Sequence, residues 1–171
     1  MVKDQSGKKI KGGVKMKIKV HNYTVLIDRE DYLKISDYCM WVMNTEYNYV
    51  YIDKFINGKR SRHRLHRYLM GVKNKTTYVD HINGNPLDNR KCNLRLCDNS
   101  QNLGNRAINK KNTSGYKGVS KTYGKTPKKW RARIQNKHIG RFYTAEEAAI
   151  AYNKMAKKVY GEFAKLNEVT K

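Results

Sequence analysis

Residues 79–106 read VDHINGNPLDNRKCNLRLCDNSQNLGNR, and this stretch decides the central part of the fold. It begins at the end of an apolar run, passes through a turn rich in Asn and Gly, and continues into a second apolar segment at residues 93–96. Asp98 then precedes Gln101 by three residues, which is the spacing of a reciprocal helix cap. The order of these signals predicts a strand, a loop, a strand and a helix, which together form a ββα unit.

The segment upstream of this unit has a different pattern. Residues 64–70 are typical of a short helix that Gly71 can cap. Residues 14–63 contain several runs in which apolar and polar side chains alternate, and Asn57-Gly58 is a hairpin turn signal. We therefore expect a small antiparallel sheet over 14–63, with one short helix near 29–38. Three aromatic residues are expected in its core: Tyr32, Tyr38 and Trp41.

Downstream of a polar linker, the sequence predicts a second small sheet. Three strand-like runs cover residues 116–123, 129–135 and 137–142. Thr144 and Glu147 form another capping pattern, and the apolar residues that follow recur on one helical face as far as Gly161. The pattern predicts a three-stranded antiparallel sheet backed by one helix.

The chain as a whole is therefore expected to be an α+β protein. Its expected parts are a β-rich N-terminal region (1–63), a central ββα domain (64–108), a linker (109–115) and a C-terminal sheet-and-helix domain (116–171). Hydrophobic residues make up 39% of the 171 residues, which suits several small cores better than one large core.

The charge of the chain points to a long polyanion as its partner. The formal net charge is +23, from 37 basic and 14 acidic residues. The excess is spread along the chain, with +6 over residues 1–63, +6 over 64–110 and +11 over 111–171. Such a distribution favours a nucleic acid. An RNA-binding protein should display aromatic side chains on a sheet face, whereas the aromatic residues here are expected in the cores, and this favours DNA.

Other features of the composition exclude several classes of protein. No apolar run is long enough for a signal peptide or a membrane span, so we expect a cytoplasmic protein without a membrane partner. The three cysteines are Cys39, Cys92 and Cys97, and no CxxC pair occurs. We therefore expect reduced thiols and no structural zinc.

The residues of the ββα unit can supply the chemistry of phosphodiester hydrolysis. This reaction needs a base for the attacking water and a cation that neutralises charge on the phosphate and on the leaving oxygen. Asp80 offers a carboxylate at the end of a strand, and Asn102 offers a carbonyl oxygen from the helix. Both are ligands that a hard divalent ion prefers. His81 is placed to take the proton of the water.

This segment closely resembles the HNH endonucleases of phages and mobile introns. In that family an Asp-His pair ends the first strand, an Asn follows twelve residues after the His, and a His or Asn about nine residues later binds the metal. His81, Asn93 and Asn102 match these positions as a His-Asn-Asn variant. The resemblance implies that His81 is the general base and that Asp80 and Asn102 hold the metal. Asn93 would brace the hairpin loop and help to orient His81.

The resemblance also implies the reaction and its partners. We expect a metal-dependent endonuclease of the homing or mobile-element type that acts on double-stranded DNA, as a monomer or weak homodimer. With one site per chain, a monomer should nick one strand. The expected ion is Mg²⁺, with Mn²⁺ as the second choice. Four residues are expected to support DNA binding in this part of the chain: His66, Arg67, Arg95 and Arg106.

The C-terminal segment resembles the plant ethylene-response-factor DNA-binding domain of the apetala-two type. The matching stretches are 116–119, 130–134, 139–142, 144–152 and 164–167. In that family a three-stranded sheet enters the major groove and a helix supports it. The resemblance implies DNA contacts from the following residues: Lys117, Ser120, Thr122, Arg131, Arg133, Gln135, His138 and Arg141. Ser120 and Gln135 replace Arg of the plant pattern, and His138 replaces Trp, so the plant target sequence does not transfer.

Three other interpretations stay open from the sequence. The ββα unit could be inactive in a DNA-binding regulator, or the C-terminal sheet could contribute only backbone contacts. The loop could also bind Ca²⁺ through oxygen ligands, although it has few carboxylates and no Glu closes it. The residues of such a calcium loop would be Asn83, Asn85, Asp88 and Asn89.

Overall fold

The computed structural model describes residues 14–44 and 47–169, so residues 1–13 of the expected N-terminal region lie outside it. The chain forms two compact units that meet between Asn102 and Leu103. The fold is mixed, with several small antiparallel sheets and four α-helices among the described residues. No helix in these ranges is both long enough and apolar enough to cross a bilayer.

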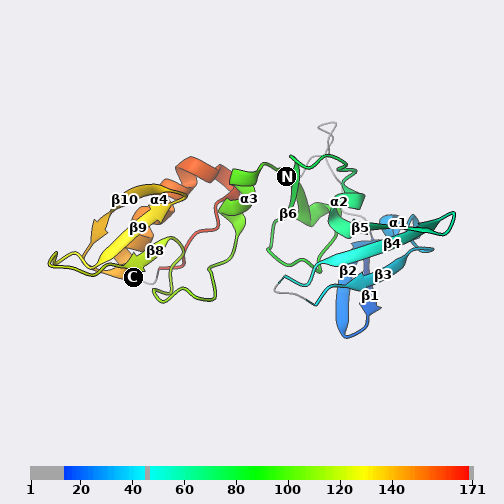
Figure 1. Ribbon diagram of the computed structural model, residues 1–171, viewed down its shortest axis with the longest axis horizontal. Helices are drawn as coiled ribbons and strands as arrows, with labels where there is room; N and C mark the ends of the chain where they lie inside the picture. The colour runs from blue at the N-terminus through cyan, green and yellow to red at the C-terminus, as the bar shows by residue number, and fades with distance from the viewer. Residues whose placement is uncertain (1–13, 45–46, 170–171) are drawn as a thin grey trace. The chain divides into compact units, whose positions relative to one another are not determined.

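The first unit contains three small antiparallel sheets, with strand orders β1-β2, β3-β4-β5 and β6-β7 (Figure 1). Its elements in chain order are β1 (Lys15–Val20), β2 (Tyr23–Asp28), α1 (Arg29–Leu33), β3 (Cys39–Val42), β4 (Val50–Ile56), β5 (Lys59–Arg64), α2 (Leu65–Leu69), β6 (Tyr78–His81), the 3-10 turn η1 (Lys91–Asn93), β7 (Leu94–Cys97) and α3 (Asn99–Asn105). α3 continues into the second unit.

The main core of this unit forms where alternate residues of the strands turn inward. Val25 and Ile27 of β2 pack with Val50 and Ile52 of β4, and all four are fully buried. Tyr32 and Tyr38 pack against this cluster, as predicted.

The prediction for Trp41 was wrong. It lies between Met40 and Val42, which both face the core, so the pleat of β3 turns its indole to the other side of the sheet. There it stacks on Tyr51 at 4.8 Å between ring centroids.

Hydrogen bonds attach the loop between β6 and β7 to β2. Leu26 donates its N–H to Leu87 O at 2.8 Å and accepts a hydrogen bond from Asn89 N at 2.7 Å. Asp28 accepts a hydrogen bond from Lys91 N at 2.9 Å, and Asp31 accepts one from Lys91 Nζ at 2.8 Å. These contacts join the predicted N-terminal region and most of the predicted central domain into one folding unit.

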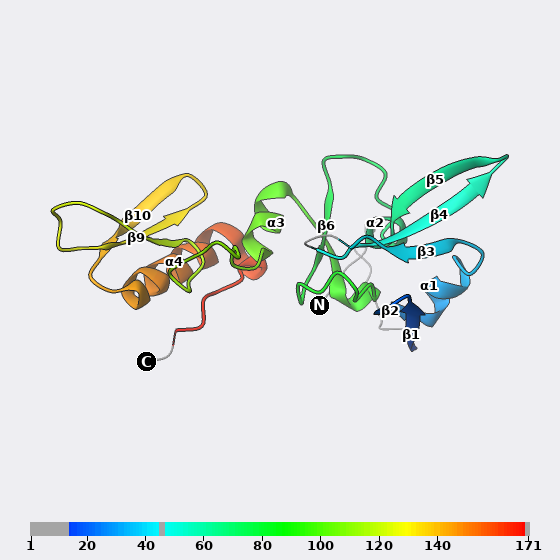
Figure 2. The ribbon, with the colours of Figure 1, turned by 60° about the horizontal axis from the view of Figure 1, so that its bottom comes forward.

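The second unit is a three-stranded sheet with one helix against one face (Figures 1 and 2). Its remaining elements are β8 (Val119–Lys121), β9 (Trp130–Ile134), β10 (Lys137–Phe142), α4 (Ala145–Tyr160) and the 3-10 turn η2 (Gly161–Phe163). α4 begins as predicted, because Glu147 N donates to Thr144 Oγ1 at 3.1 Å. Two strands are shorter than predicted, since positive φ angles at Gly118 (74°) and Gln135 (51°) lie just outside β8 and β9.

Candidate active site

The β6-β7 hairpin places Asp80 and His81 side by side at the end of β6. Asp80 pairs with Arg95 across the strands and His81 pairs with Leu94. A small cluster of Met70, Val72, Val79 and Leu94 packs beneath the hairpin. Both site residues are nearly enclosed, with exposed fractions of 8% for Asp80 and 6% for His81.

His81 lies in a cluster of aromatic rings. The ring of His66 contacts it edge to face at 5.0 Å, and Tyr49 lies 5.3 Å from His66 and 6.3 Å from His81. Burial lowers the pKa of His66 well below 6.5, and nearby positive charges lower it further. Burial also lowers the pKa of His81, although a hydrogen bond with Asn89 and the charge of Asp80 partly oppose the shift. Both imidazoles are therefore neutral at pH 7, and a neutral imidazole can accept a proton.

Asp80 forms an ion pair with Arg95. The carboxylate Oδ2 accepts hydrogen bonds from Arg95 Nε at 3.0 Å and from Nη2 at 2.9 Å. Both groups are largely enclosed, so the guanidinium compensates a carboxylate that would otherwise be costly to bury. The sequence reasoning expected Arg95 at DNA, whereas the structure places its charge on Asp80.

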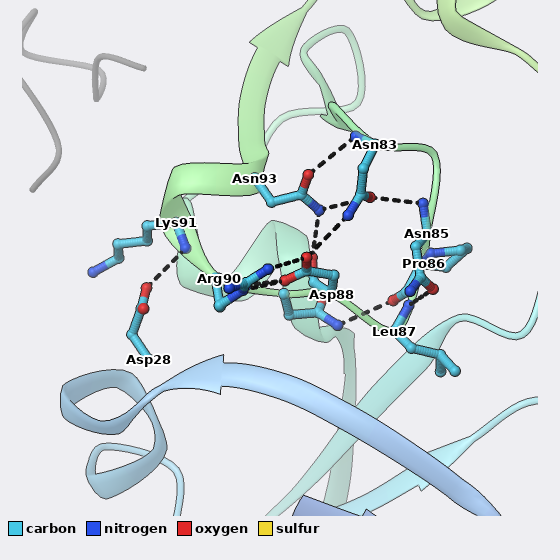
Figure 3. A network of polar contacts seen from close by, with 10 residues as sticks. Asp28, Asn83, Asn85, Pro86, Leu87, Asp88, Arg90, Lys91 and Asn93 are labelled. Atoms are coloured by element: carbon cyan, nitrogen blue, oxygen red, sulfur yellow. Dashed lines mark hydrogen bonds and ion pairs between the residues drawn. The ribbon is translucent and has the colours of Figure 1, made fainter. Parts of the chain in front are cut away.

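A hydrogen-bond network holds the loop that connects the two strands (Figure 3). The Asn93 amide accepts from Asn83 N at 3.0 Å and donates to Asn83 Oδ1 at 3.0 Å and to Asp88 O at 2.8 Å. Asp88 in turn binds Arg90 through both carboxylate oxygens, at 2.6 and 2.7 Å. Burial raises the pKa of Asp88, but the bonds and charge of Arg90 outweigh it and hold that pKa below its ordinary value.

This network also bears on the calcium-loop interpretation. Asp88 is the carboxylate of that loop, and Asn83 Nδ2 donates to its Oδ2 at 3.0 Å in addition to the Arg90 pair. Both oxygens of the Asp88 carboxylate are bonded in this way, whereas the two Arg95 contacts with Asp80 both fall on Oδ2, so Asp88 is the poorer of the two carboxylates as a Ca²⁺ ligand. The loop is therefore a structural support for the hairpin.

Sequence reasoning missed the part that Asn89 plays. Its side chain is fully buried, donates to Pro86 O at 3.0 Å, and lies close enough to the His81 ring to raise the pKa of that ring. Asn89 therefore helps to hold the loop beside His81. The only signal in the sequence was one more Asn in an Asn-rich turn, which does not distinguish Asn89 from its neighbours.

Asn102 is carried by α3, whose start is fixed by the predicted cap. Gln101 N donates to Asp98 Oδ1 at 2.8 Å, and Asp98 N donates to Gln101 Oε1 at 2.9 Å. The side chain of Asn102 is half-buried and has no hydrogen-bond partner among the described residues. Its carbonyl oxygen is therefore available to a ligand.

Metal binding at this hairpin would require a hard divalent ion that takes few ligands from the protein. Within residues 14–44 and 47–169, no three His, Cys, Asp or Glu side chains form a cluster that could hold a metal. A metal at this site would therefore rest on one carboxylate, Asp80, together with amide oxygens such as that of Asn102, and on water. Mg²⁺ commonly keeps several waters and few protein ligands.

Two other residues of this unit make contacts within the protein that the sequence did not predict. His66 is only 4% exposed, so its ring contacts His81 and Tyr49 and is not available to a phosphate. Arg67 donates to Thr77 O at 2.7 Å and also to a second backbone carbonyl, so it fastens the loop that follows α2. Arg106 lies just beyond α3 and is exposed.

The outer face of the second sheet carries a basic hollow. Arg141 and Ser120 flank Arg131 on the neighbouring strands, and His138 lies opposite Arg133. Arg131, Arg133, His138 and Arg141 line a hollow of about 330 Å³. The alternate residues of β9, Ala132 and Ile134, are buried on the other face, where α4 packs. The structure thus brings together five of the eight residues of this unit that were predicted to contact DNA: Ser120, Arg131, Arg133, His138 and Arg141.

Three predicted DNA contacts from this unit have other uses. Lys117 Nζ donates to Leu103 O at 3.2 Å and to the next carbonyl, so its charge ties down the end of α3. Thr122 is buried, and its hydroxyl donates to Lys129 O at 3.1 Å. Gln135 lies in the turn after β9 and contacts Tyr160. Alternation along a strand could not reveal these uses, because all three depend on partners outside the strand.

Comparison with known proteins bears on the β6-β7 hairpin. A family model described as HNH endonuclease matches residues 69–103. Protein 3.8 of Escherichia phage T7 is 34% identical over 94 residues, which cover 53% of this chain and 76% of that protein. The chain contains an HNH endonuclease domain at residues 69–103. A mimivirus protein of Acanthamoeba polyphaga, named Uncharacterized HNH endonuclease L560, is 37% identical over 116 residues, or 66% of this chain.

The HNH match has clear limits. This chain spans only 59% of the length of the mimivirus HNH endonuclease. The residues matched by the HNH family model run from the end of α2 into α3, so that match includes the hairpin and excludes the C-terminal sheet. No solved structure matches the chain.

Proposed function

We propose that this chain is a metal-dependent DNA endonuclease of the homing or mobile-element type, which nicks double-stranded DNA at a preferred site. The observation that carries the proposal is the placement of His81. It is a buried, neutral imidazole next to the carboxylate of Asp80, at the end of a strand in the segment that matches the HNH family.

In this proposal His81 is the general base. The His81 ring accepts a proton from the attacking water, because the lowered pKa keeps the ring neutral at pH 7. Asn93 braces the loop beside it through its bonds with Asn83.

Asp80 and Asn102 would hold a divalent cation, with Mg²⁺ as the first choice and Mn²⁺ as the second. The bound ion would supply positive charge to the phosphate and to the leaving oxygen. Arg95 balances the charge of Asp80 through the ion pair at 2.9 Å. Since one chain contains one such hairpin, we propose that a monomer cuts one strand.

The C-terminal sheet would select the DNA site in the manner of an apetala-two type domain. The support for this is the arginine-rich hollow over β9 and β10, whose side chains can reach phosphates and guanine edges. The buried Thr122 and the bonded Lys117 leave Arg131, Arg133, His138 and Arg141 as the residues that would make these contacts.

Plasmid cleavage tests the proposal. Supercoiled plasmid is incubated with the full chain, with and without Mg²⁺, beside His81→Ala and Asn102→Ala. We expect nicked circles only with metal, and at least a hundredfold loss in both variants, since general-base catalysis alone contributes about 10²–10⁴. The matched control is His21→Asn, an exposed histidine whose φ of 52° suits Asn.

The outcome also separates the two candidate functions. Binding of DNA without cleavage under both Mg²⁺ and Mn²⁺, on genome-derived as well as plasmid substrates, would favour a DNA-binding regulator with an inactive hairpin. Cleavage by His81→Ala at the wild-type rate would show that another group is the base.

A further inference from the structure

A second basic hollow lies in the first unit, beside β5 and α2. Its volume is about 670 Å³, and its walls come from β4, β5, α2 and the loop that follows α2. Four cations are in its lining, and no Asp or Glu is: Arg62, Arg64, Arg67 and Lys73. We name this hollow the β5 groove. Of its lining residues, only Arg67 was predicted from the sequence to contact DNA.

Three of the four charges have no carboxylate partner. Arg62 pairs with Asp53 at 3.1 Å. Arg64 donates to Tyr51 Oη at 3.2 Å and lies over the Tyr49 ring at 5.3 Å. Lys73 is exposed and has no hydrogen-bond or ion-pair partner among the described residues.

Arg67 also keeps its charge uncompensated, because it donates only to backbone carbonyls. Arg64 and Arg67 are therefore positioned by neutral groups that leave their positive charge intact. Side chains that are already held in place lose less entropy when an anion binds than mobile surface lysines do. This separates the β5 groove from an ordinary solvated basic surface.

The alternation of β5 explains how the cations gather. Arg62 and Arg64 stand opposite Asp53 and Tyr51 of β4, on the face that does not pack on the core. The guanidinium carbon of Arg62 covers the Trp41 ring at 4.3 Å. Trp41, which was predicted in the core, thus packs beneath Arg62 of the β5 groove.

The groove adjoins the candidate active site through Tyr49. The Tyr49 ring lies 5.3 Å from the Arg64 guanidinium carbon and 6.3 Å from the His81 ring. Arg64 and His81 are consequently no more than about 12 Å apart. At the roughly 3.4 Å of helix axis that each nucleotide occupies, this distance is at most three to four nucleotides.

We propose that the β5 groove binds the phosphodiester backbone of the strand that is cut, within a few nucleotides of the scissile bond. The ligand class is the phosphates of duplex DNA, held by Arg64, Arg67 and Lys73. This inference rests on the proposed function for the identity of its ligand. It gives the first unit its own hold on DNA, in addition to the C-terminal sheet.

Salt-dependent DNA binding tests the groove without any cleavage step. The full chain carrying His81→Ala is titrated into a short labelled duplex of mixed sequence over a range of salt concentrations. Adding Arg64→Gln and Lys73→Gln should reduce the slope of log K against log salt by about 2, since each phosphate contact contributes about 0.9. Affinity at about 0.1 M salt should fall at least tenfold.

The matched control removes two charges elsewhere in the same unit. Lys17→Gln with Lys19→Gln, on exposed positions of β1, should change the slope by less than half as much. Lys73→Gln alone controls for misfolding, because the exposed Lys73 side chain has no hydrogen-bond or ion-pair partner among the described residues, and it should lower the slope by about 1. Arg64→Lys should recover most of the slope lost in Arg64→Gln, because it restores the charge.

The outcomes distinguish failure of the groove from failure of the nuclease. Equal slopes in the groove variant and the β1 control would overturn the groove while plasmid cleavage by the wild-type chain still supports the nuclease. A loss of slope confined to the groove variants, with no cleavage by the wild type, would keep the groove and overturn the nuclease.

Discussion

Replacing Asp88 with Asn should destabilise the first unit and slow DNA cleavage. Asp88 is 1% exposed and binds Arg90 through both oxygens at 2.6 and 2.7 Å. Breaking a fully buried ion pair costs about 3–5 kcal/mol, since the remaining charge is left without compensation. Because the Arg90 side chain retains 19% exposure and regains some hydration, we expect a loss of about 2–4 kcal/mol.

The chain offers a direct assay for this change. It has two tryptophans, Trp41 in the first unit and Trp130 in the second. In a Trp130→Phe background, the fluorescence of Trp41 during guanidinium unfolding reports the stability of the first unit. Asp37→Asn is the control, because it removes one exposed carboxylate from the same unit.

The rate of cleavage should fall together with stability in the Asp88→Asn variant. The rate should be reduced even at temperatures well below the unfolding midpoint of the variant. Asp88 holds Asn83 and Asn93, and these hold the loop next to His81. A loss of stability no larger than that of the control, with wild-type cleavage, would refute the view that the Asp88 pair supports the hairpin loop.

Three further predictions concern stability. Gly118→Ala should destabilise the second unit by about 2–4 kcal/mol, because φ is +74° and a Cβ would lie 2.2 Å from a Tyr152 ring carbon. Unfolding followed by the fluorescence of the second-unit tryptophan measures this loss. A loss under about 1 kcal/mol would contradict the close packing of Tyr152 on Gly118. Thr144→Ala should cost the same unit about 1 kcal/mol through its lost helix cap, and an unchanged unfolding midpoint would contradict this. The lowered pKa of buried His66 means that, as the pH falls below 6.5, the unfolded chain binds a proton that the folded chain does not, so the free energy of unfolding should decrease by up to about 1.4 kcal/mol per pH unit. His66→Asn should reduce this dependence on pH, and His21→Asn is the control. Equal slopes in His66→Asn and the wild type would contradict the assignment.

Local signals in the sequence were sufficient for much of the fold. The two capping patterns, at Asp98 with Gln101 and at Thr144 with Glu147, form the hydrogen bonds that the spacing predicts. These elements are decided within a few residues, and the structure retains them. The β6-β7 hairpin followed by α3 has the predicted order for the same reason.

Contacts between distant segments could not be predicted. The alternation around Trp41 fits either face of a strand, and only the packing of Met40 and Val42 on the core decides which face it takes. The burial of His66 and the use of Lys117 at the end of α3 also depend on partners that are far away or outside the strand. The resemblances to known families suggested DNA contacts for both, and the structure gives both of them partners within the protein.

The attachment of the hairpin loop to β2 has a consequence for synthesis. Leu26 and Asp28 leave the ribosome some sixty residues before Leu87 and Lys91, which they hold in place. β2 is therefore synthesised before the segment that it holds. A gene fragment restricted to the matched residues 69–103 would encode the hairpin without β2, so its loop would lack the contacts that hold it in the full chain.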